Sequence, residues 1–262
     1  MKYIHQEELK KIQLNILDVV SAFCEDQGLS YFLGYGTLIG AIRHHGYIPW
    51  DDDIDIVMPR QDYDKFVQSF NDKNQIVCVV EHSLNRKYEI PFAKAYDSRT
   101  MMRETMYKET NTFGVYIDIF PLDGWGGREQ LSKIKRLYQF LNAKKAVIDS
   151  QRSFKKNCII ALGKIALTAV STSLILDKMD KTARSCNYET ADKVKSFFSV
   201  YGEKEVCDKN LLKETILVDF EGKKYRVPAN YDIYLRGIYG DYMKLPPEDK
   251  RQSTHVFQAW WK

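Results

Sequence analysis

Four aspartates crowd into five positions, at Asp51, Asp52, Asp53 and Asp55, and form the densest group of reactive side chains in the chain. Successive side chains of an extended strand alternate between its two faces, so Asp51, Asp53 and Asp55 are predicted to share one face. The side chains of Asp52, Ile54 and Ile56 are then predicted to lie on the opposite face. Neighbouring carboxylates repel, and strand interiors disfavour aspartate, so a hard divalent cation is the simplest way to neutralise this row. The pattern predicts a site for Mg²⁺ or Mn²⁺.

A glycine-rich turn lies upstream of the aspartates. Residues 33–40 have the pattern of a strand end, a turn and a helix start, with Thr37 at the N-cap or in the first turn. A helix start offers free N–H groups and a partial positive charge, which together favour a bound phosphate. The sequence therefore predicts a phosphate-binding helix start shortly before the acidic row.

Two familiar motifs do not fit these residues. The glycines of the turn give G-x-G-x-x-x-G, one residue off the dinucleotide-binding fingerprint, and no Lys-Ser or Lys-Thr pair follows to make a P-loop. The aspartates match the first three ligand positions of a calcium-binding EF-hand. However, Ile56 stands where its glycine must be, and Asp62 where its glutamate is expected. Both interpretations are rejected.

Length and composition describe a globular protein. The chain has 262 residues, 44% of them hydrophobic and 28% charged, which suits one large domain or a domain with an insertion. Its five cysteines are scattered, without a C-x-x-C pair, so we expect reduced thiols rather than a disulfide framework. The amino-terminal segment is polar and lacks the apolar core of a signal peptide, so we expect the protein in the cytoplasm.

Hydrophobic periodicity predicts helices and strands through most of the chain. Helices are expected over residues 6–27, with Gly28 just past the end, and over 38–43, 61–70 and 231–239. Strands are expected over residues 31–33, 53–57, 76–80, 92–96 and 113–120, and a hairpin over 215–227 that turns at Glu221 and Gly222. We expect the first helix to pack across the sheet that carries the aspartates.

A further aspartate stands inside the predicted strand 113–120. The valine and isoleucines of this strand share one face, and Asp118 lies on the other. An aspartate in an apolar strand is costly unless it has a partner, and the simplest partner is a metal held by Asp53 and Asp55. We therefore interpret Asp118 as a third carboxylate of the site. The alternative is an aspartate at a strand end that caps a turn.

Charge and hydropathy change after residue 128. Residues 128–164 hold ten lysines and arginines against Glu129 and Asp149, a net charge of +8, whereas the whole chain carries +4, so the remainder carries −4. Long helices are expected over 131–148 and 157–176, and the second is strongly apolar apart from Lys164, which argues against a membrane span. It is either a buried core helix or an interfacial helix on an anionic membrane surface, which would attract the basic block.

The acidic pair Asp53 and Asp55, after a phosphate-binding helix start, resembles the signature of the nucleotidyltransferase superfamily. Residues 36–63, GTLIGAIRHHGYIPWDDDIDIVMPRQDY, are similar to the LicD family of bacterial phosphorylcholine transferases in the order of the glycine-threonine turn, Arg43, Trp50 and the aspartates. The resemblance continues over residues 114–123 and 239–243 and at the prolines 246–247. No matching motif is found from about residue 128 to residue 220.

The resemblance implies an α+β fold, in which a nucleotidyltransferase-like mixed sheet is flanked by helices and carries an inserted or appended helical region. We expect a catalytic core over residues 1–127 and a basic helical region over 128–210. Residues 211–262 are expected to form a hairpin and a helix that complete the catalytic unit.

The resemblance also implies a set of catalytic residues. In phosphoryl transfer, metal ions held by carboxylates on adjacent strands contact the attacking oxygen, the phosphoryl oxygens and the leaving group. Asp53 and Asp55 are the expected metal ligands. Asp118 is the expected third ligand, and it also helps to polarise or deprotonate the acceptor hydroxyl. The expected cofactor is Mg²⁺ or Mn²⁺.

Further residues are expected to bind the donor. Gly36 and Thr37 would contact its pyrophosphate through the backbone and the hydroxyl group, and Arg43 and Lys94 are cationic candidates for its oxygens. A quaternary ammonium group needs aromatic neighbours, and Trp50 is one candidate. The other aromatic candidates are Tyr47, Tyr231, Tyr234, Tyr239, Tyr242, Trp260 and Trp261.

For function, the resemblance implies that phosphocholine passes from CDP-choline, or from a related CDP-alcohol, to a sugar hydroxyl of a cell-surface glycan precursor, with release of CMP. A lipid-linked precursor would bring the enzyme to the inner face of the membrane, where the basic block meets anionic lipid. Two alternatives remain open. One is a nucleotidyltransferase that retains the nucleoside monophosphate on its acceptor and releases pyrophosphate, and the other is a non-catalytic glycan- or membrane-binding module. Nucleic acid is not expected as a partner, because the basic block lacks interleaved base-stacking residues.

Overall fold

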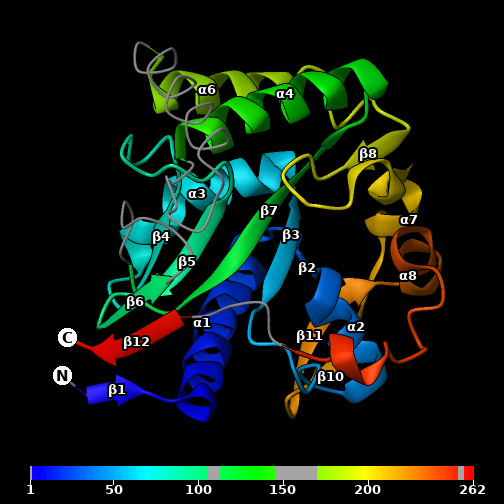
Figure 1. Cartoon of the computed structure of the whole chain (residues 1–262). Helices are drawn as coiled ribbons and strands as arrows, with labels where there is room; N and C mark the ends of the chain where they lie inside the picture. The colour runs from blue at the N-terminus through cyan, green and yellow to red at the C-terminus, as the bar shows by residue number, and fades with distance from the viewer. Residues whose placement is uncertain (1, 105–112, 146–169, 253–256) are drawn as a thin grey trace.

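A mixed sheet near the middle of the molecule carries the aspartates (Figure 1). The computed structural model describes residues 2–104, 113–145, 170–252 and 257–262. The strands of this sheet are β2 (Phe32–Leu33), β3 (Asp55–Pro59), β4 (Val77–Val80), β5 (Ala93–Asp97), β7 (Tyr116–Gly124), β8 (Lys193–Lys195) and β9 (Cys207–Asp208). They run in the order β2-β3-β7-β5-β4, with β8 paired to the end of β7 and β9 paired to β8.

The direction of the strands makes the sheet mixed. β3 and β7 are parallel, and the other pairs are antiparallel. The predicted mixed sheet flanked by helices is confirmed at this level. The strand bounds differ from the expectation by one to four residues, most at β3, which runs over 55–59 and not 53–57, and at β7, which runs over 116–124 and not 113–120. Asp118 therefore lies inside a nine-residue strand, not at a strand end where it could cap a turn.

Two helices cover one face of the sheet. α1 (Gln6–Gln27) is confirmed with its predicted bounds, and Gly28 ends it with a left-handed φ of 64°. α3 (Arg60–Lys73) follows β3 directly. Phe23 of α1 packs edge-on against Phe66 and Phe70 of α3. The two helices thus form one apolar layer, as predicted for the first of them.

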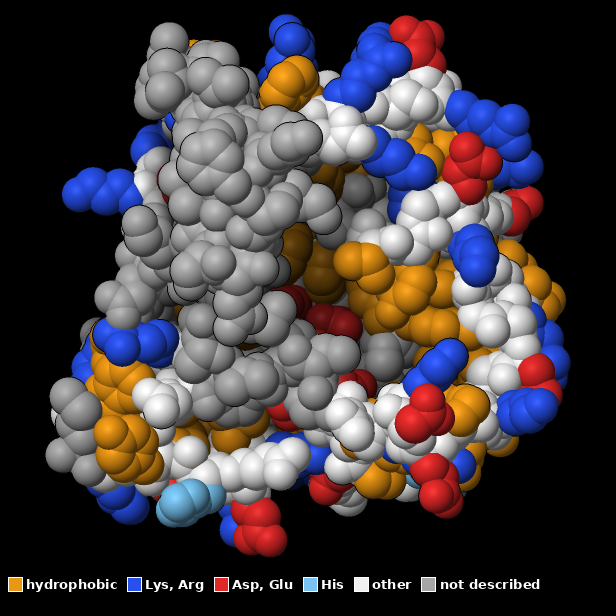
Figure 2. Space-filling view, viewed as in Figure 1, with side chains coloured by type: hydrophobic (Ala, Val, Ile, Leu, Met, Phe, Trp, Pro, Cys, Tyr) orange, Lys and Arg blue, Asp and Glu red, His pale blue; other side chains and the backbone are white. Residues whose placement is uncertain are grey.

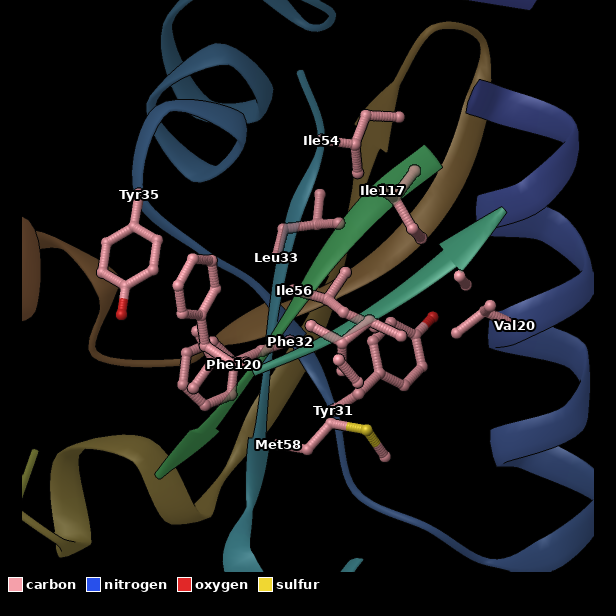
Figure 3. Close-up of a cluster of buried hydrophobic side chains, with 14 of the residues drawn as sticks. Val20, Tyr31, Phe32, Leu33, Tyr35, Ile54, Ile56, Met58, Ile117 and Phe120 are labelled. Carbon is pink, nitrogen blue, oxygen red and sulfur yellow. The ribbon is translucent and has the colours of Figure 1, made fainter. Parts of the chain in front are cut away.

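The two faces of the central strands differ in character. In Figure 3, Val20 of α1 lies on the same side of β3 and β7 as Ile117, whereas Tyr35 and Phe120 lie on the other side. Because side chains alternate along a strand, Asp118 shares the face of Phe120. The apolar face is therefore buried under α1 and α3, and the opposite face is the one that carries the polar chemistry.

Two helices from the second half of the chain lie side by side (Figure 1). α4 (Arg128–Lys145) confirms the first of the two helices expected there. The prediction of a helix over residues 157–176 is wrong at its carboxy-terminal end. The backbone is extended at Ser171, and the helix α6 (Thr172–Ala183) begins directly after it. Ile175 and Leu176 of α6 are buried, so this part of the apolar run belongs to the core. Residues 157–169 lie outside the described residues.

The region 128–210 contributes strands as well as helices. β8 pairs with the end of β7 at Asp123 and Gly124, so this region extends the central sheet. Two short helices follow, the 3-10 helix η1 (Gly202–Glu205) and α7 (Asn210–Lys213). The division of the chain into three domains stays a prediction.

The carboxy-terminal elements follow the predicted pattern. β10 (Thr215–Phe220) and β11 (Lys223–Pro228) form the expected hairpin, with positive φ at Glu221 and Gly222 in its turn. α8 (Tyr231–Tyr239) ends at Gly240 as expected. A small sheet, β1 (Lys2–Ile4), β12 (Phe257–Trp261) and β6 (Thr100–Glu104), joins the two ends of the chain and was not predicted.

Two further expectations concern sulfur chemistry and membranes. The cysteines in the described parts of the chain, Cys24, Cys78, Cys186 and Cys207, are free thiols, as expected, and Cys158 lies outside those parts. No helix within the described residues is long and apolar enough to cross a membrane.

Candidate active site

Three neighbouring strands bring two carboxylates and an ammonium group into one row. Asp55 of β3 is the direct neighbour of Asp118 of β7, and Asp118 is the direct neighbour of Lys94 of β5. Adjacent strands lie about 5 Å apart, so the three side chains are within reach of one another. Lys94 Nζ lies 2.7 Å from Asp118 Oδ1, and Lys94 is only 3% exposed. The register of the sheet thus brings together three residues that the sequence had marked separately.

Lys94 has a partner within the chain itself. The sequence predicted that it binds the oxygens of a donor and that a metal compensates Asp118. In the structure the chain itself supplies the partner, because the Lys94 ammonium is paired with Asp118. The same ammonium lies 3.3 Å from the ring centroid of Tyr116, a cation–π contact that holds it in place. Lys94 is therefore the counter-ion of Asp118 in this structure, and its contact with donor oxygens stays a prediction.

Further carboxylates surround Asp55. Burial raises the pKa of Asp55 well above its ordinary value, the charges of Asp53, Asp118 and Asp51 raise it further, and Lys94 lowers it. Negative charge therefore exceeds positive charge around Asp55. Figure 2 shows acidic side chains deep in a hollow on this face of the molecule, with hydrophobic side chains along one side of it.

The predicted alternation of the aspartates is seen in their burial. The side chains of Asp51, Asp53 and Asp55 are partly exposed, whereas Asp52 is 5% exposed and Ile54 is fully buried. This pattern begins before β3 does, because residues 51–54 are outside regular strand structure. Asp51, Asp53 and Asp55 therefore share the polar side, as predicted.

The helix start upstream is bonded to the backbone on both sides of Asp55. α2 (Tyr35–His44) begins three residues before the expected helix, and Thr37 lies in its first turn, as predicted. Thr37 Oγ1 accepts a hydrogen bond of 2.8 Å from the Asp55 N–H, and the Gly34 N–H donates one of 2.9 Å to the Asp55 carbonyl oxygen. Thr37 is 3% exposed. The hydroxyl expected to bind a donor thus holds Asp55 in position.

Gly36 faces a carboxylate. A β-carbon at Gly36 would lie 2.7 Å from Asp51 Oδ2, closer than such contacts occur, so another residue here would push the Asp51 side chain aside. The positive end of the α2 dipole favours a negative charge at this point, and the Asp51 carboxylate provides one. The first turn of α2 therefore supports the acidic cluster in this structure, and its contact with donor pyrophosphate stays a prediction.

Two predicted binding residues, Arg43 and Trp50, contact the carboxy-terminal segment. Arg43 is six residues beyond Thr37, about 9 Å along the helix axis. Its guanidinium donates to the backbone oxygen of Tyr242 and to His44 Nε2. The Trp50 ring contacts the His44 ring and lies 5.7 Å from the Arg251 guanidinium carbon. Arg43 and Trp50 thus connect α2 to the carboxy-terminal segment, and the structure does not bring them into the row of Asp55, Asp118 and Lys94.

Sequence reasoning missed part of an aromatic wall beside the acidic cluster. The rings of Tyr35 and Tyr201 stack with centroids 5.2 Å apart, Tyr239 meets Tyr201 edge-on at 5.0 Å, and the Tyr239 hydroxyl donates to the Tyr201 hydroxyl oxygen over 2.6 Å. Burial raises the pKa of Tyr201 to about 12, with the charge of Asp55 contributing. Tyr239 was one of several aromatic candidates, whereas Tyr201 stands in a region without a matching motif, and no local signal marks it.

Carboxylate oxygens are the kind of ligand that a hard cation such as Mg²⁺ binds. Within the described residues, no three carboxylate, imidazole or thiol groups are placed to hold one metal ion as they stand. Mg²⁺, however, is commonly bound by one or two carboxylates together with substrate phosphates. Burial and then the neighbouring carboxylates raise the pKa of Asp55, and a cation would compensate the charge of those carboxylates. Asp53 and Asp55 are therefore suitable oxygen ligands for a cation whose coordination a phosphorylated substrate completes.

Comparisons with known proteins show which family the chain is similar to. The family model described as "LicD/FKTN/FKRP, nucleotidyltransferase domain" matches residues 28–166. The lipopolysaccharide cholinephosphotransferase LicD of Haemophilus influenzae is 31% identical over 271 residues, which cover 99% of this chain and 99% of that protein. An uncharacterized protein of Rickettsia typhi is 28% identical over 141 residues, 48% of this chain and 45% of its own length. One of Rickettsia prowazekii is 34% identical over 95 residues, 36% and 33% of the two chains.

Asp55→Asn is expected to raise the melting temperature of chelator-treated protein at pH 8, because it removes a charge that the folded state disfavours. The pKa of Asp55 is higher in the folded protein than its ordinary value of about 4, so the folded state holds the proton more tightly. Wild-type stability then falls as the pH rises between these two pKa values. The advantage of asparagine is therefore full above the raised pKa and vanishes as the pH falls towards 4.

Thermal melting from pH 4 to pH 8 measures this difference, and each kcal/mol corresponds to about 2–4 °C in a chain of this size. The control is Asp72→Asn, at an exposed aspartate of α3. An equal shift in both variants, or a destabilised Asp55→Asn protein at pH 8, would show that Asp55 does not carry disfavoured charge.

Proposed function

Because this chain belongs to the LicD/FKTN/FKRP nucleotidyltransferase family, we propose that it transfers phosphocholine from a CDP-linked donor to a sugar hydroxyl of a cell-surface glycan and releases CMP. The observation that carries the proposal is the row of Asp55, Asp118 and Lys94 on adjacent strands, inside the segment that matches the family model. A relative that aligns over 99% of the chain is named a lipopolysaccharide cholinephosphotransferase, which supports lipopolysaccharide as the acceptor. We infer that the sheet is the nucleotidyltransferase-like catalytic sheet.

The proposed reaction exchanges one phosphorus–oxygen bond for another. The acceptor hydroxyl oxygen attacks the phosphorus that carries choline, and the bond from that phosphorus to the bridging oxygen breaks, so CMP leaves with the bridging oxygen. Asp118 accepts the hydrogen bond, and then the proton, of the attacking hydroxyl, and Lys94 orients its carboxylate. Mg²⁺ or Mn²⁺, held by Asp53 and Asp55 with Asp118 as the nearest further ligand, would neutralise the charge of the phosphates.

The aromatic wall supports a quaternary ammonium head group in the donor. Tyr201 and Tyr239 are partly exposed and contact each other, and Tyr201 stacks on Tyr35, the residue before Gly36, which faces the Asp51 carboxylate. A cation over the face of an aromatic ring is attracted by its quadrupole, and the neighbouring carboxylates add to the attraction. Choline recognition is therefore proposed at Tyr201 and Tyr239 rather than at Trp50.

The purified chain is expected to release CMP from CDP-choline when supplied with lipopolysaccharide and Mg²⁺ or Mn²⁺, and phosphocholine should appear on the glycan. Asp53→Asn and Asp55→Asn should lower the rate at least about 100-fold, because each removes a charge that stabilises the transferring phosphoryl group. The control is Asp52→Asn, which changes the same charge on the buried side and should keep most of the activity.

Analysis of the released nucleotide distinguishes the alternatives. Pyrophosphate released from a nucleoside triphosphate, with the monophosphate retained on an acceptor, would replace the proposal with a nucleotidyltransferase. Glycan binding without consumption of any activated nucleotide would identify a non-catalytic module.

Tyr201→Leu should weaken the use of CDP-choline more than that of CDP-ethanolamine or CDP-glycerol. A cation–π contact contributes about 0.5–2 kcal/mol, which corresponds to a loss of about 2- to 30-fold in kcat/KM. Tyr201→Phe keeps the ring and should keep the preference for choline. Initial rates of CMP release measure both effects, and an equal loss for all three donors would assign Tyr201 a structural role only.

We further propose that the protein works in the cytoplasm at the inner face of the membrane. Exposed basic residues of α4 support this proposal, namely Arg128, Lys133, Lys135 and Arg136, and Phe140 of the same helix is 50% exposed. Lysine and arginine contribute about 1 kcal/mol each near an anionic bilayer, and salt weakens this attraction. The part of the basic block beyond residue 145 lies outside the described residues.

Sedimentation with lipid vesicles tests this location. We expect binding to vesicles that contain phosphatidylserine but not to pure phosphatidylcholine vesicles, with weaker binding in high salt and in the double variant Lys135→Glu, Arg136→Glu. The double variant Lys11→Glu, Lys65→Glu, at exposed lysines of α1 and α3, changes the net charge equally and is the matched control, which should bind as the wild type does. Equal behaviour towards both kinds of vesicle would remove the membrane from the proposal.

A further inference from the structure

A buried ion pair lies behind the aromatic wall. Lys195 of β8 and Glu205 at the end of η1 have fully buried side chains, and Lys195 Nζ lies 2.9 Å from Glu205 Oε2. Both residues stand in the region for which the sequence offered no motif. Two charges that water cannot reach are tolerated in a protein interior only when hydrogen bonds satisfy their remaining donors and acceptors.

The pair meets that condition through its neighbours. The Lys195 ammonium also donates to the Ser196 carbonyl oxygen at 2.8 Å and to Ser199 Oγ at 3.4 Å. The Ser199 hydroxyl donates to Glu205 Oε2. The second carboxylate oxygen, Glu205 Oε1, accepts a hydrogen bond of 2.6 Å from the hydroxyl of Tyr35. The network therefore ends on the first residue of α2.

A buried ion pair of this kind fixes the positions of its neighbours more than it adds to the free energy of unfolding. Well-packed apolar side chains of similar volume commonly replace a buried ion pair without loss of stability. What apolar side chains could not supply here is an acceptor for the Tyr35 hydroxyl. Burial and the charge of Glu205 raise the pKa of Tyr35 well above its ordinary value, so this hydroxyl stays protonated and donates.

Tyr35 needs such an anchor because of its backbone. Its φ of +43° lies in the left-handed region, which residues with bulky side chains rarely adopt unless their surroundings hold them there. The ring is held by Tyr201 on one side and by Phe120 of β7, edge-on at 5.3 Å. The hydroxyl is held by Glu205. The turn from β2 into α2 therefore depends on a residue that lies 170 positions later in the chain.

The same turn holds the candidate catalytic residue Asp55. Tyr35 is followed two residues later by Thr37, whose hydroxyl accepts the Asp55 N–H, and it is preceded by Gly34, which donates to the Asp55 carbonyl oxygen. A shift of Tyr35 would move both of these contacts. A displacement of about 1 Å at a reacting group can cost about 100-fold in rate, so small shifts matter here.

We propose that the Lys195–Glu205 pair is a positioning device, which holds Tyr35 in its left-handed conformation and thereby fixes the first turn of α2 against Asp55. Neither Lys195 nor Glu205 is proposed to touch the substrate. The effect on turnover rests on the proposed function, whereas the effect on the backbone at Asp55 does not.

Hydrogen exchange at the Asp55 amide tests the structural half of the proposal. In Tyr35→Phe, which loses only the hydroxyl, and in Glu205→Gln, this amide should exchange about tenfold faster or more, because the turn that covers it opens more often. Tyr225→Phe is the matched control for the first variant, since the buried Tyr225 hydroxyl likewise donates to a carboxylate, that of Asp18, over 2.7 Å.

Asp97→Asn is the matched control for Glu205→Gln, because it likewise replaces a buried carboxylate that is paired with a basic side chain, that of Arg99, at the end of β5 and away from Lys195. Both controls should leave the exchange rate of the Asp55 amide near that of the wild type, even where they lower the melting temperature as much. Unchanged exchange in Tyr35→Phe and Glu205→Gln, or equal acceleration in the controls, would overturn the proposal.

Steady-state rates of CMP release test the second half. Tyr35→Phe and Glu205→Gln should lower kcat about tenfold and change KM for CDP-choline less than twofold, because a misplaced Asp55 acts on the chemical step. The double variant should be no slower than the slower single variant, since both changes act through one contact.

The outcomes for the two proposals are separable. If the wild-type protein releases no CMP from any CDP-alcohol, the proposed function fails, and the exchange experiment alone decides the positioning device. If the wild type is active and the two variants keep full kcat in spite of faster exchange at Asp55, the device does not serve the reaction.

Discussion

Repulsion between carboxylates is the constraint on which the site depends. Two unit charges about 5 Å apart repel by about 3 kcal/mol at an effective dielectric constant of 20. Asp55 has the charges of Asp53, Asp118 and Asp51 around it, and Lys94 is the positive charge that acts against them. Other interactions of the fold have to offset the free energy of this repulsion. A cation bound together with a phosphorylated substrate would reduce the repulsion that is left.

The opposite face of the same strands supplies part of that free energy. Ile56 of β3 and Ile117 of β7 are fully buried under the layer formed by α1 and α3. Full burial of one isoleucine contributes about 1.5–3 kcal/mol, so one or two of them offset one repulsive pair. Alternation along a strand makes this arrangement economical, because each strand presents an apolar anchor to one side and a reactive carboxylate to the other.

Backbone contacts then decide where the carboxylates lie. Thr37 of α2 and Gly34 just before this helix are bonded to the N–H and the carbonyl oxygen of Asp55, and the Asp51 carboxylate lies against Gly36 in the first turn. The region 128–210 takes part in the same construction. It adds β8 to the central sheet and Tyr201 to the aromatic wall. A region that looked like a separate helical addition is therefore connected to the candidate site.

The sequence by itself determined what depends on neighbouring residues. Periodicity predicted α1, α3, α8 and the hairpin closely, and alternation placed Asp51, Asp53 and Asp55 together on one side, because both follow from the local geometry of helices and strands. The tertiary structure alone decided that Lys94 is paired with Asp118, 24 residues away, and that Tyr35 is anchored on Glu205, 170 residues away. Strand register and buried ion pairs form between segments that are far apart in the sequence. The local pattern of residues in one segment does not indicate which other segment will lie opposite it.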